Sequence, residues 1–554
     1  MKFFSFPTAV KTLTLCATLC ISGQAAHATE YVWSGNTNGQ PADWFAAKNW
    51  EAEVPSTPVT FLKKAVGSLV RSANSEPSGV PGPGDCAIIG AGANVAINQP
   101  AVIGNLTVED GGTLQGSGAV SVTESLVLDG SKLLGTGKVT LATSATIKVT
   151  DGGEGVDNLI AKTIDNKGNM IWESGHVTLQ KDFLNHGTVY LGCDGALNAV
   201  VPNSGNAPKF YNDGTVIKAI SIGQSLFDAE FVNTGDIYVR SGQLNVGPSF
   251  TQTSGSLNLD GGDVATSGTF EINGGIVKGI GTLDGSVVND GGTFKPGHSP
   301  GYITIMGNYT QTSNGTLEME IGGTDAGTQY DQMNVYGSAN LNGELEISKW
   351  NNYTPAAGTN FYLITSYNMS NDFATFTGIY LGNQLYYQLT KSPSDYIAAV
   401  WADTAAPTLN VTQPAANTSY NSIGSAKGTA TDYYSGVNKV TCRLYRFAVG
   451  STPAGYWAGG TSWTTGYTAA NNEKLATGTT NWTWALPSLA TGQYYVKVTA
   501  RDNVGNSVQS ANIVFNKVAS GGNTAAATAP SSNSASSSTV ARLFPEDWPQ
   551  LRAF

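Results

Sequence analysis

The most suggestive chemical motif in this 554-residue sequence is Gly297-His298-Ser299-Pro300-Gly301, which has the G-x-S-x-G spacing of a hydrolase nucleophile elbow. Such an elbow needs a helix after the serine and a backbone N–H on the next residue for the oxyanion hole. Here the next residue is Pro300, which has no N–H, and the residues that follow alternate like a strand. The motif therefore predicts a structural turn rather than a nucleophile.

Two pairs of carboxylates also have a spacing that chemistry could use, Glu318 with Glu320 and Glu344 with Glu346. Residues two apart on a strand point to one face at about 7 Å, a separation found in inverting glycosidases. The residues that alternate with these glutamates are apolar, so the glutamates are expected on the solvent face of their strands. No catalytic residue is predicted, and we expect that the protein is not an enzyme.

Calcium is the one cofactor for which the sequence offers ligands. Residues 152–160 match the calcium nonapeptide G-G-x-G-x-D-x-U-x once, with Asp157 as the carboxylate. One copy supplies only part of the about 6–8 oxygens that Ca²⁺ takes, which favours an ordinary turn. Asp432, Asp502 and Asn503 offer a second oxygen-rich set. Both sets are predicted calcium ligands, and no other cofactor is predicted.

Aromatic side chains indicate ligand binding more clearly. The predicted ligand-binding residues lie in turn-rich stretches, where exposed rings can stack on sugars; they are Tyr433, Tyr434, Tyr456, Trp457 and Trp463. The alternative for these residues is local packing. Trp482 and Trp484 share one face of a strand and are expected in the core.

Composition narrows the classes of partner. The sequence has 29 Lys and Arg against 40 Asp and Glu, a formal net charge of −11, and no run of residues concentrates the basic ones. Nucleic acid is therefore not an expected partner, and neither is anionic lipid bound through counterion release. The 67 Gly show no G-X-Y period, which excludes collagen, and 40% apolar residues can form a buried core.

The N-terminus has the form of an export signal. Lys2 and Lys11 precede an apolar stretch from Leu13 to Ile21, and Ala26-His27-Ala28 is an A-x-A cleavage site. This predicts a signal peptide over residues 1–28 and a secreted, extracellular or cell-surface protein. No later segment approaches about 20 uninterrupted apolar residues, so no integral membrane span is predicted.

A repeat dominates residues 95–350 and positions the candidate residues that lie within this range, such as Asp157 and Glu318. Polar turns recur at steps of 19, 27, 21, 20, 19 and 17 residues, counted on Gly168, Gly187, Gly214, Gly235, Gly255, Gly274 and Gly291. A period near 20 with alternating apolar residues between the turns is typical of a solenoid, in which each coil buries the apolar face of the next. Gly and Asn are expected to supply positive φ at the corners. The sequence therefore predicts an all-β fold that begins with a right-handed parallel β-helix.

The other segments complete the predicted organisation. Residues 29–94 are expected to cap the solenoid, and strands within residues 351–402 to close its far end. Short strands separated by turns over residues 403–517 predict an antiparallel β-sandwich. The Ser- and Ala-rich residues 518–540 read as a disordered linker, and residues 541–554 as a short C-terminal tag.

Two parts of the sequence resemble bacterial families. Trp33-Ser34-Gly35 and the P-G-x-S-P-G signature of residues 296–301 resemble the passengers of autotransporter-type β-helix proteins. Thr429-Ala430-Thr431-Asp432 and the segment Ala500 to Asn506 resemble a bacterial immunoglobulin-like module. The resemblance implies an extracellular β-helix of adhesive or structural role, followed by a module that serves as spacer or adhesion unit.

The sequence as a whole predicts a secreted or surface-associated, non-catalytic adhesin or structural protein of the bacterial envelope or extracellular matrix. Its expected partner is an extracellular glycan or a surface protein. Two alternatives remain open. One is a polysaccharide-degrading β-helix enzyme, a glycoside hydrolase or a lyase, and the other is a carbohydrate-binding protein without turnover.

Overall fold

The computed structural model describes residues 30–33, 42–46, 50–53, 80–109, 111–151, 157–199 and 206–519. The predicted signal peptide (1–28), much of the predicted cap, almost all of the predicted linker and the C-terminal tag lie outside these residues. The described residues are mostly β-strand with one short helix, α3 (Ala469–Asn472). No helix among them is long and apolar enough to cross a membrane. Two compact units, Met1–Thr404 and Ala405–Phe554, divide the chain.

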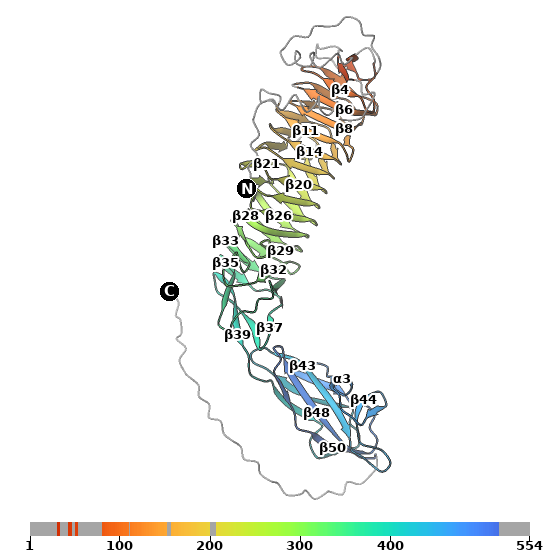
Figure 1. Ribbon diagram of the computed structural model, residues 1–554, viewed down its shortest axis with the longest axis vertical. Coiled ribbons are helices and arrows are strands. Elements are labelled where there is room, and N and C mark those ends of the chain that lie inside the picture. Colours follow the sequence, from red (N-terminus) through yellow and green to blue (C-terminus); the bar gives the residue numbers. More distant parts are fainter. Residues whose placement is uncertain are drawn as a thin grey trace. The chain divides into compact units, whose positions relative to one another are not determined.

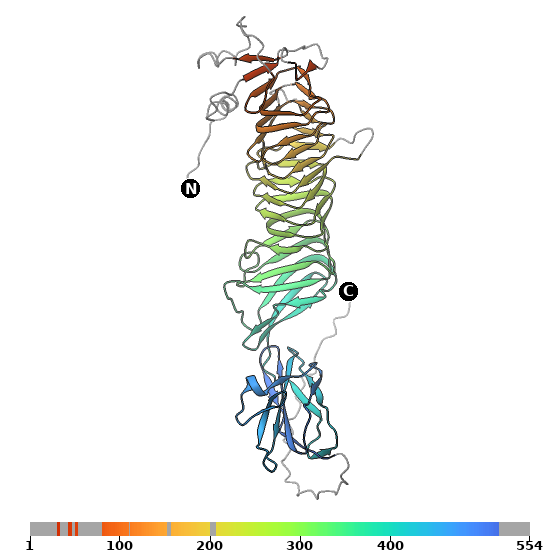
Figure 2. The same ribbon diagram turned by 90° about the vertical axis from the view of Figure 1, so that its right-hand side faces the viewer.

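The first unit is a long, mostly parallel sheet that winds in a solenoid-like manner (Figures 1 and 2). Its middle coils have three strands each, and every strand pairs in parallel with its counterpart in the next coil. One series is β12 (Asn158–Ile160), β15 (Val177–Leu179), β18 (Ala196–Ala199), β21 (Gln224–Asp228) and β24 (Gln243–Asn245). The second is β13 (Ile164–Asn166), β16 (Phe183–Asn185), β19 (Lys209–Asn212), β22 (Glu230–Asn233) and β25 (Phe250–Gln252). The third is β14 (Asn169–Trp172), β17 (Thr188–Leu191), β20 (Thr215–Lys218), β23 (Asp236–Val239) and β26 (Ser256–Asp260).

The coils before and after this middle part follow the same pattern. The preceding strands are β4 (Cys86–Ile89), β5 (Asn94–Ala96), β6 (Ala101–Glu109), β7 (Thr113–Gln115), β8 (Val120–Asp129), β9 (Lys132–Leu133), β10 (Val139–Leu141) and β11 (Thr146–Thr150). The following ones are β27 (Asp263–Ile272), β28 (Ile276–Asn289), β29 (Thr293–Pro296), β30 (Tyr302–Ile305), β31 (Tyr309–Gln311), β32 (Thr316–Ile321), β33 (Gln332–Leu341), β34 (Glu344–Lys349) and β36 (Thr375–Thr377). The expected all-β, largely parallel fold is thus confirmed.

Antiparallel strands terminate both ends of this sheet. At the start, β1 (Glu30–Trp33) pairs antiparallel with β3 (Trp50–Glu53), and β2 (Ala42–Asp43) lies between them in sequence. At the other end, β35 (Asn360–Asn371), β39 (Asp395–Ala402), β38 (Leu385–Lys391) and β37 (Tyr380–Gly382) form antiparallel pairs. A parallel sheet that ends in antiparallel pairs does not offer its last coil edge for further stacking.

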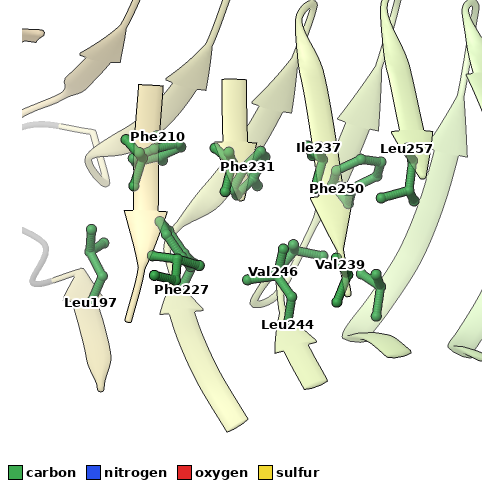
Figure 3. Close-up of a cluster of buried hydrophobic side chains, with 14 of the residues drawn as sticks. Leu197, Phe210, Phe227, Phe231, Ile237, Val239, Leu244, Val246, Phe250 and Leu257 are labelled. Carbon is green, nitrogen blue, oxygen red and sulfur yellow. The ribbon is translucent and has the colours of Figure 1, made fainter. Parts of the chain in front are cut away.

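A column of phenylalanine rings fills the interior of the middle coils. The strand register aligns Phe183, Phe210, Phe231, Phe250 and Phe270, and each ring is at most 1% exposed. Neighbouring ring centroids are 4.9–5.7 Å apart. Figure 3 shows Phe210, Phe231 and Phe250 in successive strands, with aliphatic side chains such as Val246 and Leu257 around them. Each ring is therefore covered by the equivalent rings of the adjacent coils, so neighbouring coils bury each other's apolar side chains.

A column of amides runs beside the rings. Asn166, Asn185, Asn212, Asn233 and Gln252 occupy equivalent positions and are fully buried. Each side-chain nitrogen donates to the side-chain oxygen of the next coil, at 2.8, 2.7, 2.7 and 3.0 Å in that order. The turn asparagines thus point into the core, and the expectation that they supply positive φ at the corners is wrong.

Some corner glycines are required for a reason other than the expected positive φ. Gly187, Gly214 and Gly235 do not have positive φ. A Cβ on any of them would lie under 3.0 Å from the carbonyl oxygen of the equivalent glycine in the preceding coil. Glycine is therefore required at these corners because successive backbones approach closely, and positive φ applies to others such as Gly255.

The second unit consists of two sheets. The smaller contains β40 (Thr408–Gln413), β42 (Ser425–Thr431) and β47 (Asn481–Ala485). The larger follows the order β41 (Thr418–Tyr420), β50 (Ile513–Lys517), β48 (Gly492–Asp502), β43 (Val437–Arg446), β44 (Gly455–Gly459) and β45 (Ser462–Thr464), with β46 (Lys474–Leu475) beside β43 and β49 (Ser507–Gln509) beside β48. All pairs are antiparallel except β41 with β50.

One hydrophobic core joins the two sheets of this unit. It contains Trp482 and Trp484 from the smaller sheet, as the sequence predicted, and Val440, Leu444 and Val498 from the larger one. The three described cysteines, Cys86, Cys193 and Cys442, are free thiols. Packing across the two sheets therefore holds this unit without a disulfide among these residues.

Candidate functional site

The outward side of two central strands in the second unit carries a set of polar and aromatic side chains. Strand β43 buries Val440, Cys442 and Leu444 in the core, so its alternate residues Lys439, Thr441, Arg443 and Tyr445 point to the other side. Strand β48 buries Val496, Val498 and Ala500 and turns Tyr495, Lys497, Thr499 and Arg501 to that same side. We call these eight outward residues the outer face.

Residues of the same kind stand opposite each other across the outer face. The antiparallel register pairs Lys439 with Arg501, Thr441 with Thr499, Arg443 with Lys497 and Tyr445 with Tyr495. The face therefore reads as two cationic pairs, one on each side of a pair of hydroxyls, followed by a pair of phenol rings. Directly opposed residues on one face of a sheet are within contact distance of each other.

The aromatic end of the outer face is a cluster of tyrosines. The Tyr445 ring lies 4.9 Å from that of Tyr495 in a nearly parallel arrangement, and 4.8 Å from that of Tyr456 on β44. Tyr467 extends the cluster, 5.4 Å from Tyr456. Tyr495 lies underneath at 7% exposure, whereas Tyr467 is 38% exposed. The pKa of Tyr495 is raised above its ordinary value, mainly by burial and secondarily by a hydrogen bond with Tyr456.

Arg443 connects the aromatic and cationic parts of this face. Its guanidinium carbon lies 4.5 Å from the centre of the Tyr467 ring, and its Nε is buried without a hydrogen-bond partner. The nearby Glu473 instead accepts hydrogen bonds from the hydroxyls of Tyr467, at 2.6 Å, and Thr441, at 3.1 Å. A cation over an aromatic face is a suitable place for a ligand with sugar rings or anionic groups.

The structure separates the five aromatic residues that the sequence singled out. Tyr456 lies in the tyrosine cluster of the outer face, in a strand rather than a turn. Trp457 turns the opposite way, 5.7 Å from Trp484, and its Nε1 donates to the carbonyl of Gly460. Trp463 lies between the ring of Tyr494, at 6.3 Å, and the guanidinium of Arg446, at 4.4 Å.

The remaining two predicted aromatics are exposed together. Tyr433 is 92% and Tyr434 50% exposed, and their rings are 5.2 Å apart in the turn that follows β42. Sequence reasoning missed Tyr445, Tyr467 and Tyr495. Apolar residues alternate around Tyr445 and Tyr495, which predicts strands. The outward positions of these strands could have identified the two tyrosines.

Asp432, Asp502 and Asn503 do come together at one end of this unit. A carboxylate oxygen of Asp432 lies within 4.8 Å of one of Asp502. The Asn503 side-chain nitrogen donates to the carbonyl of Ser435 at 2.8 Å, which ties the two turns to each other.

Both carboxylates already hold backbone groups. Asp432 Oδ1 accepts the N–H groups of residues 434, 435 and 436, and Asp502 Oδ1 accepts those of residues 504, 505 and 506. These hydrogen bonds to Oδ1 stabilise the two turns, and two carboxylates supply only part of the about 6–8 oxygens that Ca²⁺ takes.

Asp157 belongs to a hollow in the first unit. The hollow has a volume of about 320 Å³ and is formed by equivalent turns of three coils; its lining includes Asp151, Asp157, His176, Cys193 and Asp194. The His176 ring nitrogen Nδ1 lies 4.0 Å from Asp157 Oδ1. Residues 152–156 of the calcium nonapeptide lie outside the described residues.

A buried lysine lies beside this hollow. The Lys218 side chain is fully buried, and its amine donates to the hydroxyls of Ser221 and Ser225 at 2.6 and 3.1 Å. Asp194 Oδ1 is 3.5 Å from the amine, and burial lowers the pKa of Lys218 from its ordinary value. The amine thus stabilises the turn that carries Asp194.

The remaining sequence motifs have structural roles. The turn of Gly297 to Gly301 joins β29 to β30, and its Gly301 N–H donates to Asp331 Oδ1 at 2.7 Å. A strand rather than a helix follows Ser299, as expected. Glu318 lies on the outward side of β32 and forms an ion pair with Lys295, while Leu317 and Met319 are buried.

No family model matches this chain, and no curated protein matches it. A function is therefore assigned from the geometry of three places: the outer face, the turns of Asp432 and Asp502, and the hollow at Asp157.

Proposed function

We propose that this protein is a secreted or surface-associated, non-catalytic adhesive protein of the bacterial envelope or extracellular matrix that binds an extracellular glycan. In this proposal the first unit is a right-handed parallel β-helix that serves as a spacer. The second is an immunoglobulin-like sandwich that carries the binding surface. The observation that supports binding is the tyrosine cluster of Tyr445, Tyr456, Tyr467 and Tyr495 on the outer face.

The chemistry of this cluster suits a sugar. The apolar faces of sugar rings stack on aromatic rings, while sugar hydroxyls need nearby donors and acceptors. Arg443 and Lys497 supply donors beside the Tyr445 and Tyr495 rings, Thr441 and Thr499 supply hydroxyls one pair further along, and Glu473 supplies a carboxylate next to Tyr467. The cluster also rests on a rigid sheet, because Tyr495 beneath it is buried between neighbours. A pre-formed platform loses little conformational entropy on binding.

The interior of the first unit supports a spacer role. Stacked phenylalanines and a hydrogen-bonded amide column occupy the inside of its middle coils, as described above for Phe231 and Asn212. The outward Glu318, which could have acted as an acid, is ion-paired with Lys295. These coils use their side chains for stacking on one another.

Glycan binding can be tested with the chain from Thr29 onward on an array of extracellular polysaccharides. We expect binding to at least one glycan, and a loss of several-fold to about tenfold in affinity for Tyr456→Ala and Tyr467→Ala. The matched control is Tyr367→Ala, which removes an 84% exposed tyrosine from the first unit and should bind like the parent. An array without any binding above background would contradict the proposal.

The hollow at Asp157 favours a second candidate function, a polysaccharide-degrading enzyme. It gathers Asp151, Asp157, Asp194 and His176 in one depression, and carboxylates and imidazole are the usual groups of acid and base catalysis. The test is reducing-end release from a panel of polysaccharides. Turnover that falls at least about 100-fold in Asp157→Asn would establish this function over the non-catalytic one.

A further inference from the structure

The second unit is cationic in an acidic chain. Residues 405–519 contain eight Lys and Arg against three Asp and Glu, a balance of +5. Residues 1–404 contain 19 Lys and Arg against 35 Asp and Glu, a balance of −16. Net charge of one sign, confined to one unit, attracts partners of the opposite sign.

Half of the cations in residues 405–519 stand on the outer face as two directly opposed pairs, Lys439 with Arg501 and Arg443 with Lys497. Like charges directly opposite each other across a sheet destabilise it. Two such pairs on the outer face therefore lower the stability of the fold. The arrangement has a physical reason if an anion lies between the paired cations.

The nearby carboxylate of Glu473 accepts hydrogen bonds from the hydroxyls of Tyr467 and Thr441 and forms no salt bridge with these cations. Among the residues that the structure describes, no salt bridge includes Lys439, Arg443, Lys497 or Arg501. The first unit is different, because Lys138, Lys148, Lys209 and Lys295 are each paired with a carboxylate. The buried Nε of Arg443, which has no hydrogen-bond partner, is a further unused donor on this face.

We propose that the outer face binds an acidic polysaccharide. Its carboxylate or sulfate groups lie at the Lys439–Arg501 and Arg443–Lys497 pairs, and its sugar rings contact Tyr445, Tyr456 and Tyr467. This inference rests on the proposed function, which it deepens by naming the class of glycan. Arginine suits planar carboxylate and sulfate groups because its guanidinium donates two parallel hydrogen bonds.

The geometry favours an extended, repeatedly charged ligand. Lys439 and Arg443 are four residues apart along one strand, a separation of about 13 Å. A small anion could satisfy one cation pair but would leave the other unpaired. A polymer with charges at intervals of a few sugar units reaches both pairs and the tyrosine cluster at once. Thr441 and Thr499, between the two pairs, can bond the sugar hydroxyls.

Two double variants and one charge-matched control test the inference in the chain from Thr29 onward. Lys439→Gln with Arg501→Gln removes one opposed pair, and Arg443→Gln with Lys497→Gln removes the other. The control, Lys427→Gln with Lys517→Gln, makes the same change of charge in the same unit away from the outer face. The carboxylated probe is polygalacturonate, the sulfated probe is dextran sulfate, and the neutral probe is dextran.

We expect at least one acidic polysaccharide to bind, and each outer-face double variant to lose about tenfold or more in affinity. The control double variant should stay within about twofold. Binding should also weaken strongly as the sodium chloride concentration rises, because salt screens the attraction between the cations and the anionic groups. The melting temperature of the outer-face variants should be unchanged or raised, since like-charge repulsion is relieved.

The outcomes separate this inference from the proposed function. If neutral dextran binds as well as the acidic polymers and the charge variants retain affinity, the inference is overturned and glycan binding stands. If no polysaccharide binds, both fail. Binding to single-stranded DNA or to phosphatidylglycerol vesicles, without binding to the acidic polysaccharides, overturns the inference in favour of another class of polyanion.

Discussion

Asn212 Nδ2 donates a 2.7 Å hydrogen bond to Asn233 Oδ1 in the next coil, and both side chains are fully buried. The same bond recurs from Asn166 to Gln252, so Asn185, Asn212 and Asn233 each both donate and accept within the column. A buried amide is costly unless its groups are paired, and here the pairing requires the coils to be in register. The amide column thus specifies how the coils align.

Replacing Asn212 with leucine should destabilise the first unit. The change removes the acceptor of Asn185 and the donor to Asn233, and it leaves polar groups unpaired in the core. We expect the free energy of unfolding to fall by about 1–3 kcal/mol, measured by urea denaturation followed by circular dichroism. Asn368→Leu, at an exposed position, is the control and should change little. Equal stability of Asn212→Leu and the parent would contradict the role of the column.

Removing one ring from the phenylalanine column should cost more. Phe231 contacts Phe210, Phe227 and Phe250 with ring centroids 4.9–5.7 Å away. Phe231→Ala is expected to lower the free energy of unfolding by about 3–5 kcal/mol through lost burial and the cavity left behind. Phe376→Ala, at a 37% exposed ring, is the matched comparison in the same assay. If both variants lowered the free energy of unfolding equally, the buried phenylalanine column would contribute no more to stability than an exposed ring.

A methyl group at a corner glycine should also be poorly tolerated. A Cβ at Gly214 would collide with the carbonyl oxygen of Gly187 in the preceding coil. Gly214→Ala should therefore destabilise the unit by about 1–3 kcal/mol, with a lower melting temperature. Gly90→Ala has open space around the new Cβ and ordinary φ, so it controls for the general effect of alanine. A melting temperature for Gly214→Ala as high as that of Gly90→Ala would mean that the coils can separate without cost.

Asp331 should make the stability of the first unit depend on pH. Burial raises the pKa of Asp331 to about 7 from 3.8, although N–H groups of Glu320 and Gly301 bond to its carboxylate and favour the charged form. Because the folded state holds the proton more tightly than the unfolded state, this contribution to stability is complete below about pH 4 and is lost as pH rises through about 7.

The measurement is urea denaturation at several pH values across that window, for the parent and for Asp331→Asn. Asparagine cannot ionise, so the variant should lose this part of the pH dependence. It should also be less stable throughout, because its amide nitrogen faces a backbone N–H in place of an accepting oxygen. The same slope in parent and variant would assign the pH dependence to other groups.

The calcium prediction at Asp432, Asp502 and Asn503 can be tested by chelation. If an ion joins the two carboxylates, EGTA should lower the melting temperature of the parent, and added calcium should restore it. A variant with Asp432→Asn and Asp502→Asn should not respond to either reagent. A parent whose melting temperature is the same in EGTA and in calcium would contradict the calcium prediction.

Local patterns in the sequence were sufficient to predict the strands and their buried faces. The alternation around Leu317 and Met319, and at Trp482 and Trp484, correctly indicated which side chains would be buried. The turn period near 20 residues indicated coils that stack. Such predictions succeed because a strand's two faces are set by adjacent residues, and each coil must cover the apolar face of the next.

The tertiary structure alone decided which distant residues meet. It turned Asn212 inward to bond Asn233, and it required glycine at Gly214 for close approach rather than for its φ. It also placed Arg443 opposite Lys497, 54 residues further along the chain, which assembled a basic face where the sequence shows no basic run. Register between strands depends on the packing of the whole sheet, so no local pattern of residues contains it.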